Sequence, residues 1–95
     1  MTDSSGVKVV KRGGKKVEDF DPAKLAASVS AACHSVKLPD GVAEDTAKQV
    51  LKATASWLGN KTEVTSEDLR RVATRTLAIV SPEAGYLYKH HHTML

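Results

Sequence analysis

The amino-acid sequence predicts a mostly helical α+β domain in which an N-terminal β-hairpin caps a bundle of four short helices. The chain has 95 residues, enough for one domain with a single modest core. Aromatic residues make up only 4% of the chain, so the core must be largely aliphatic, which suits packed helices better than a β-sandwich. A glycine-centred hairpin pattern precedes four segments in which apolar residues recur at helical spacing.

The organisation of the chain follows from its composition. We expect residues 1–6 to be a flexible leader, residues 7–92 a single domain and residues 93–95 a C-terminal tail. No apolar run could span a membrane, and the N-terminus lacks the pattern of a secretion signal, so a cytoplasmic location is expected. Cys33 is the only cysteine, which excludes an internal disulfide, and its apolar helix face favours a buried side chain.

The sequence of residues 7–20 is typical of a β-hairpin. The adjacent residues Gly13 and Gly14 supply the positive φ angles that a two-residue hairpin turn needs. A turn at these glycines pairs Val9 with Glu18 and Lys11 with Lys16. One face of the hairpin then carries Val7, Val9, Lys11, Lys16, Glu18 and Phe20.

The positive charge of the chain is concentrated in this hairpin. The formal net charge is +3, and residues 7–16 contain no acidic residue but five basic ones, Lys8, Lys11, Arg12, Lys15 and Lys16. Because the rest of the chain is close to balanced, this pattern favours a local anion site over a broad basic face. The facing Lys11 and Lys16 either hold charge for an anion or extend into water, and the sequence leaves both open.

Capping residues and apolar spacing define the first two helices. The first begins at Pro22 with Asp21 as its N-cap, and its buried stripe is Leu25, Val29, Ala32, Cys33 and Val36. The second covers about residues 42–58 and stops at Gly59. Along its buried side we expect Val42, Thr46, Val50, Ala53 and Trp57, with Ala43, Ala47 and Leu58 beside them.

The second half of the chain continues with a candidate third strand and two more helices. Residues 61–64 form a candidate edge strand, which would make the sheet three-stranded. The third helix opens with Thr65 as N-cap, and its stripe is Leu69, Val72, Ala73, Thr76, Leu77 and Val80. Pro82 begins the fourth helix, which runs toward His92.

Catalytic and metal-binding patterns are missing from the sequence. It contains no G-x-S-x-G, P-loop, HExxH or Rossmann fingerprint, and no nucleophile–base pair is evident, so we expect a non-catalytic protein. Residues 90–92 are three consecutive histidines, which cannot all face one metal ion. A frayed polar C-terminus is therefore favoured there over a zinc site.

Three blocks of sequence resemble the ATP-cone domain. The first is Val9-Val10-Lys11-Arg12-Gly13-Gly14, followed by Glu18 and then Phe20-Asp21-Pro22-Ala23-Lys24-Leu25. The second is the V-T-S-E-D-L stretch of residues 64–69, and the third is Ser81-Pro82-Glu83-Ala84 with Tyr88. The order and spacing of the three blocks match over about residues 7–90.

The resemblance implies a nucleotide sensor. ATP-cones are small regulatory modules that bind ATP or dATP and thereby change how their host protein assembles. They occur in ribonucleotide reductase large subunits and in a zinc-ribbon repressor of the reductase genes. The implied effector is ATP or dATP, with Mg²⁺ as a candidate companion. The candidate partners are a second copy of the chain, a ribonucleotide reductase subunit or a transcription factor. With one cysteine, this chain lacks the repressor's four-cysteine ribbon, so we expect a stand-alone cone.

The resemblance also assigns roles around the phosphates and the base. Lys11 and Arg12 are expected to contact the phosphates, which a compact ammonium and a guanidinium fork bind well. Lys24 lies one turn into the first helix, near the positive end of a helix dipole that also favours anions. Glu18 is expected to accept a hydrogen bond from the adenine amino group.

The remaining matched positions frame the base and the sugar. Val9 matches a position beside the nucleotide, and Leu25 matches one that packs on the base. Asp21 matches a base-contacting position while also serving as a helix N-cap. In the third helix, Ser66 and Arg70 match positions that approach the sugar or the phosphates.

Two other functions remain open at the level of sequence. A small nucleic-acid-binding protein could use the basic segment of residues 8–16, although this leaves Glu18 and the block of residues 20–25 unexplained, and the hairpin lacks stacking aromatics. A protein-interaction module could keep the fold and have lost nucleotide binding. Selective binding of adenine nucleotides is expected of an ATP-cone and of neither alternative.

Overall fold

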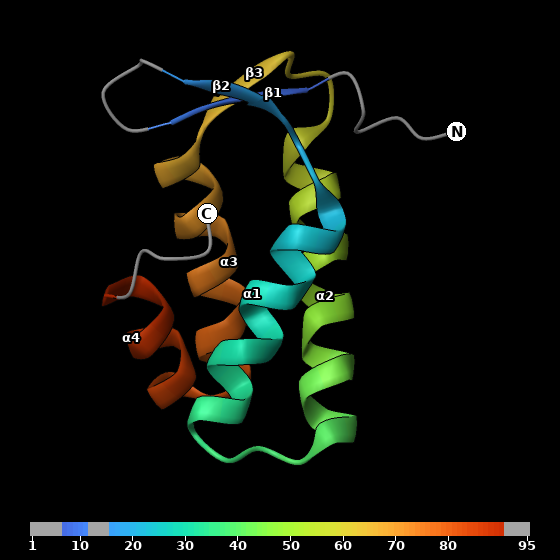
Figure 1. The fold of residues 1–95 in the computed structure, drawn as a ribbon. Coiled ribbons are helices and arrows are strands. Elements are labelled where there is room, and N and C mark those ends of the chain that lie inside the picture. Colours follow the sequence, from blue (N-terminus) through green and yellow to red (C-terminus); the bar gives the residue numbers. More distant parts are fainter. Residues whose placement is uncertain (1–6, 12–15, 91–95) are drawn as a thin grey trace.

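The computed structural model describes residues 7–11 and 16–90 and confirms a mostly helical α+β fold (Figure 1). A three-stranded sheet lies across one end of four helices. The strands are β1 (Lys8–Val10), β2 (Val17–Asp19) and β3 (Glu63–Thr65). The helices are α1 (Pro22–Ser35), α2 (Asp40–Leu58), α3 (Ser66–Val80) and α4 (Pro82–His90).

The register of the hairpin is the predicted one. β1 and β2 are antiparallel with Val9 opposite Glu18, and the Lys11 N–H donates to the Lys16 carbonyl at 2.8 Å. The turn, with its two glycines and Arg12, lies outside the described residues. The two-residue turn at the glycines therefore stays a prediction.

The candidate third strand is present. β3 pairs in parallel with β1, placing Val9 opposite Val64, and the strand order is β2-β1-β3. β3 leads without a loop into α3, so the start of this helix lies directly beneath the sheet (Figure 1).

Side-chain caps fix where three helices begin. The Asp21 carboxylate accepts hydrogen bonds from the N–H groups of Ala23 at 3.0 Å and Lys24 at 3.3 Å. Thr65 Oγ1 accepts one from the Asp68 N–H at 3.0 Å, and Ser81 Oγ accepts one from the Ala84 N–H at 3.1 Å. Each bond satisfies a backbone donor that the helix leaves without an internal partner. The predicted starts of α1, α3 and α4 are therefore confirmed.

The core joins one sheet face to the helices. The hairpin contributes Val7, Val9 and Phe20, and α1 contributes Leu25, Val29, Ala32 and Cys33 as predicted. Tyr88 of α4 is also buried, and its hydroxyl lies 2.9 Å from Ser28 Oγ, linking α4 to α1. Trp57 is partly buried against the core, with the Lys61 ammonium 5.0 Å from its ring centroid. Within the described residues, no helix is long and apolar enough to cross a membrane.

The predicted buried side of α2 is largely confirmed, with Thr54 as an addition and Val42 as the exception. The buried residues are Ala43, Thr46, Ala47, Val50, Thr54 and Leu58, whereas Val42 is 39% exposed. α2 packs against both α1 and α3, and its close approach to them selects the alanine and threonine side chains. Val80 of α3 is also exposed, because it lies in the last turn of that helix.

Candidate functional site

A small hollow lies beneath the hairpin, where the sheet meets the first turns of α1 and α3. Its lining residues are Val9, Lys11, Glu18, Asp19, Phe20, Asp21, Lys24, Ser66 and Leu69. Two helix N-termini therefore contribute to one site, and each presents backbone N–H groups and a partial positive charge. The backbone alone makes this end of the molecule favourable for an anion.

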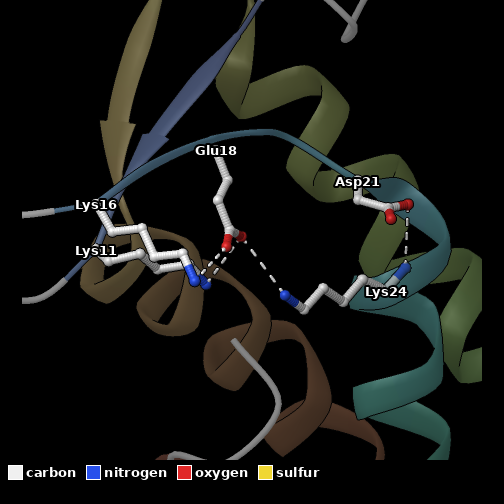
Figure 2. Close-up of polar contacts among 5 residues, drawn as sticks. All are labelled: Lys11, Lys16, Glu18, Asp21 and Lys24. Atoms are coloured by element: carbon white, nitrogen blue, oxygen red, sulfur yellow. Dashed lines mark hydrogen bonds and ion pairs between the residues drawn. The ribbon is translucent and has the colours of Figure 1, made fainter.

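Three lysines converge on one carboxylate in this hollow (Figure 2). Glu18 Oε1 lies 3.5 Å from Lys11 Nζ and 3.5 Å from Lys24 Nζ, and Glu18 Oε2 lies 3.5 Å from Lys16 Nζ. Lys11 directly follows β1, Lys16 directly precedes β2 and Lys24 lies in α1, so the tertiary fold brings them together. Three ammonium groups around one carboxylate leave an excess of positive charge.

The lysines change the acidity of Glu18. Partial burial of this carboxyl group works to raise its pKa, but the Lys11 and Lys24 ammonium groups outweigh that effect and hold the pKa of Glu18 below its ordinary value. The carboxylate is therefore ionised at neutral pH. It acts as an internal counter-ion for the lysines.

The hollow is filled by these side chains. Its free volume is about 20 Å³, which is room for roughly one water molecule. A larger anion can enter only if the lysines part from Glu18. The apolar wall beside them is made by Val9, Phe20 and Leu69, all largely buried.

The structure brings six of the nine expected site residues to this hollow, namely Val9, Lys11, Glu18, Asp21, Lys24 and Ser66. Arg12 lies outside the described residues. Leu25 is 0% exposed and lies in the core, so the structure gives it no access to a base. Arg70 lines a different groove, between α3 and α4.

The hollow also contains residues that were not expected as site residues. Lys16 belongs to it through its ion pair with Glu18, and the sequence signal for it was the cross-strand pairing with Lys11. The two facing lysines differ in their exposure to solvent. Lys11 is only 19% exposed and faces a carboxylate, while Lys16 is 71% exposed. Phe20 and Leu69 looked like ordinary core residues, and only their tertiary placement shows that they form a wall.

Across residues 7–11 and 16–90, no group of three or more His, Cys, Asp or Glu side chains is placed to hold a metal ion. His91 and His92 lie outside this range.

A family model matches nearly the whole chain. The model of the ATP cone domain family matches residues 7–93. Searches of curated proteins and of solved structures returned no significant match. The family consists of non-catalytic regulatory domains whose members bind ATP or dATP as effectors. Because the match spans nearly the whole chain, this protein belongs to the ATP-cone family of nucleotide-binding regulatory domains.

Proposed function

We propose that this chain binds ATP or dATP in the hollow beneath the hairpin and couples binding to assembly with a second copy or another protein. The observation that carries the proposal is the convergence of Lys11, Lys16 and Lys24 on Glu18 at the first turns of two helices. The candidate partners remain a ribonucleotide reductase subunit and a transcription factor. The expected location remains cytoplasmic.

The phosphates replace Glu18 as the counter-ion of the lysines. A triphosphate carries several negative charges where Glu18 carries one, so exchanging the carboxylate for the phosphate chain strengthens the attraction to the ammonium groups. The helix N-termini add N–H donors for the phosphate oxygens, with Ser66 at the first position of α3. Arg12 belongs to the same proposal through the family motif. Mg²⁺ would enter with the phosphates, which supply much of its oxygen coordination.

The released Glu18 reads the base. Adenine presents an amino group where guanine presents a carbonyl oxygen, and only the amino group can donate a hydrogen bond to a carboxylate. Val9 offers an apolar contact to the nucleotide, and Asp21 a second acceptor beside its cap bonds. Glu18 therefore has two successive roles, neutralising the lysines in the free protein and selecting adenine in the complex.

Regulation requires that two assembly states differ in nucleotide affinity. Only this difference can shift the equilibrium between them. A coupling of about 1–3 kcal/mol corresponds to roughly a 5–150-fold change in partner affinity.

Nucleic-acid binding through the hairpin is less well supported. Lys8 is ion-paired with Asp19, and Lys11 and Lys16 are ion-paired with Glu18. These acidic residues neutralise much of the charge that a phosphodiester backbone would need.

Titration calorimetry and thermal unfolding with ATP, dATP, GTP and ADP test the proposal. In the hollow variant, Lys11→Ala with Lys24→Ala, we expect the stabilisation by ATP to disappear. A ligand at 100 times its Kd stabilises a protein by about 2.7 kcal/mol, so the loss is easily measured. Glu18 keeps its ion pair with Lys16 in this variant, so no carboxylate is left without a counter-ion and the ligand-free variant should stay folded.

The matched control is the α2 variant, Lys48→Ala with Lys52→Ala. It removes the same charge from exposed positions of α2 that do not line the hollow. It should bind ATP as the unmodified protein does. A folded hollow variant that binds ATP with unchanged affinity would overturn the proposal.

A further inference from the structure

A buried chain of hydrogen bonds joins α4 to the first turn of α1. The Tyr88 hydroxyl of α4 lies 2.9 Å from Ser28 Oγ, and Ser28 Oγ donates a hydrogen bond to the Leu25 carbonyl at 2.7 Å. All three residues are at most 6% exposed. None of them lines the hollow, and none is among the proposed nucleotide contacts. We call these three residues the Tyr88 link.

The number of available hydrogens fixes the direction of these bonds. A serine hydroxyl carries one hydrogen, and in Ser28 this hydrogen points to the Leu25 carbonyl. Tyr88 must therefore donate its own hydrogen to Ser28 Oγ. Burial raises the pKa of Tyr88, and the opposing effects of the Ser28 hydrogen bond and the charge of Arg70 do not outweigh it. The phenol therefore keeps its hydrogen at neutral pH and acts as a constant donor.

The link ends in the turn of α1 that faces the hollow. Leu25 directly follows Lys24 in sequence, and the Leu25 N–H donates to the Asp21 carbonyl at 3.2 Å. Lys24 and Asp21 both line the hollow, and Lys24 Nζ lies 3.5 Å from Glu18 Oε1. The end of the link is thus a backbone neighbour of two proposed nucleotide contacts. Because the ends of helices fray, an additional bond to this turn restricts its movement.

The other end of the link is held by α3. α4 packs against both α3 and α1 (Figure 1). Its approach to α3 is very close at Gly85, where an added Cβ atom would lie 2.8 Å from Ala78 Cβ. α4 is therefore packed tightly on α3 and hydrogen-bonded to α1, and the first turns of these same two helices flank the hollow. Through the link, α4 braces the first turn of α1 against α3.

We propose that Tyr88 is a positioning residue for the hollow, which acts through Ser28 to hold the first turn of α1 in the arrangement that binds the nucleotide. This role rests on the proposed function, because it concerns the geometry of the same site. Holding Lys24 and Asp21 in place before the nucleotide arrives reduces the entropy lost on binding, so breaking the link should weaken binding although no ligand contact is removed. If the link raises the affinity for nucleotide by a given factor, bound nucleotide must stabilise the link by the same factor.

Titration calorimetry with ATP, on the full chain and well below its unfolding temperature, tests this role. Tyr88→Phe removes the hydroxyl and keeps the ring, and it should weaken ATP binding about threefold, which is within the usual effect of one hydrogen bond. Ser28→Ala removes the acceptor and should weaken binding to a similar extent. Because both changes break one link, the variant that carries both should also bind about threefold more weakly, whereas independent effects would multiply to about ninefold.

The matched control is Val50→Ala. Val50 is a fully buried residue of α2 that belongs neither to the hollow nor to the link, so this change destabilises the fold without touching either. It should leave the affinity for ATP unchanged, since a loss of stability does not alter binding while nearly all of the protein stays folded. A merely structural role of Tyr88 predicts the same unchanged affinity for Tyr88→Phe.

The amide NMR signal of Tyr88 gives a second readout. Saturating ATP should shift this signal in the unmodified protein, although Tyr88 does not line the hollow, because bound nucleotide stabilises the link. In Ser28→Ala, where the link is broken, the shift should fall by at least half.

Three results would overturn the proposal. Tyr88→Phe could bind ATP as tightly as the unmodified protein, Val50→Ala could weaken binding as much as Tyr88→Phe, or the Tyr88 signal could respond to ATP equally with and without Ser28. Failure of the proposed function looks different, because the unmodified protein would then not bind ATP at all. The positioning role alone fails when the unmodified protein binds ATP and both link variants bind it equally well.

Discussion

At the scale of single residues, Glu18 compensates the positive charge of the hollow. Three lysines brought together without a counter-ion would repel one another and open the hairpin. The carboxylate, 3.5 Å from each ammonium, prevents this. In the proposed complex, the phosphates compete with this carboxylate for the lysines.

The lowered pKa of Glu18 predicts how stability depends on pH. A carboxyl group whose pKa is lower in the folded state stabilises the fold above its unfolded pKa, near 4.5, and this contribution is lost as the pH falls through the lowered value. We expect the unmodified protein to lose more stability on acidification below about pH 4.5 than Glu18→Gln, which cannot ionise. Urea unfolding across this pH range measures the difference. Parallel pH profiles of the two proteins would contradict it.

Some residue positions could be predicted from sequence and others could not. The hairpin register follows from local turn chemistry, and it correctly put Val9, Lys11 and Glu18 on one face. Leu25 and Arg70 show the limit. One full helical turn separates Arg70 from Ser66, and this distance moves it from the hollow to the groove. Leu25 is drawn into the core by packing among α1, the sheet and α3, which involves residues far apart in sequence.

At the scale of elements, the packing of α4 on α3 depends on one glycine. A Cβ atom added to Gly85 would lie 2.8 Å from Ala78 Cβ and 2.9 Å from Ala78 Cα. Because Ala78 is short and the second contact is with backbone, no side-chain rotation relieves the clash. The two helices therefore approach as closely as their backbones allow, which fixes the width of the α3–α4 groove.

This contact predicts opposite effects for two glycine-to-alanine changes. Gly85→Ala should destabilise the protein by about 1–3 kcal/mol, because α4 must move away from α3. Gly41→Ala, in the first turn of α2 with nothing within 4 Å of the added atom, should stabilise it by about 0.5–1 kcal/mol. Chemical denaturation of both variants checks the pair. A neutral or stabilising Gly85→Ala would show that the helices separate freely.

The elements themselves were largely predictable, because their signals are local. Asp21, Thr65 and Ser81 cap the helices they were expected to cap. On the buried side of α2, Thr54 was missed, because it is buried through its fit against α1 and α3. Apolar periodicity weights large side chains, whereas a closely packed interface selects small ones.

At the scale of the whole molecule, the proposed coupling of nucleotide binding to assembly makes a prediction. We expect the sedimentation coefficient of the protein, or of its complex with a partner, to change with saturating ATP or dATP. The hollow variant should show no change, because it lacks the ligand contacts. If nucleotide binding changes the affinity for the partner by a given factor, assembly must change the affinity for nucleotide by the same factor. Sedimentation velocity with and without nucleotide measures the change, and an unchanged value at saturation would contradict self-assembly.

The parallel pairing of β1 with β3 also decides when the site can exist. Val9 and Val64 are paired although two helices lie between them in the chain, so their contact closes a long loop at a cost in entropy. Ser66, which lines the hollow, follows directly after β3. A chain still emerging from the ribosome therefore lacks part of the lining of the hollow until the start of α3 has been synthesised.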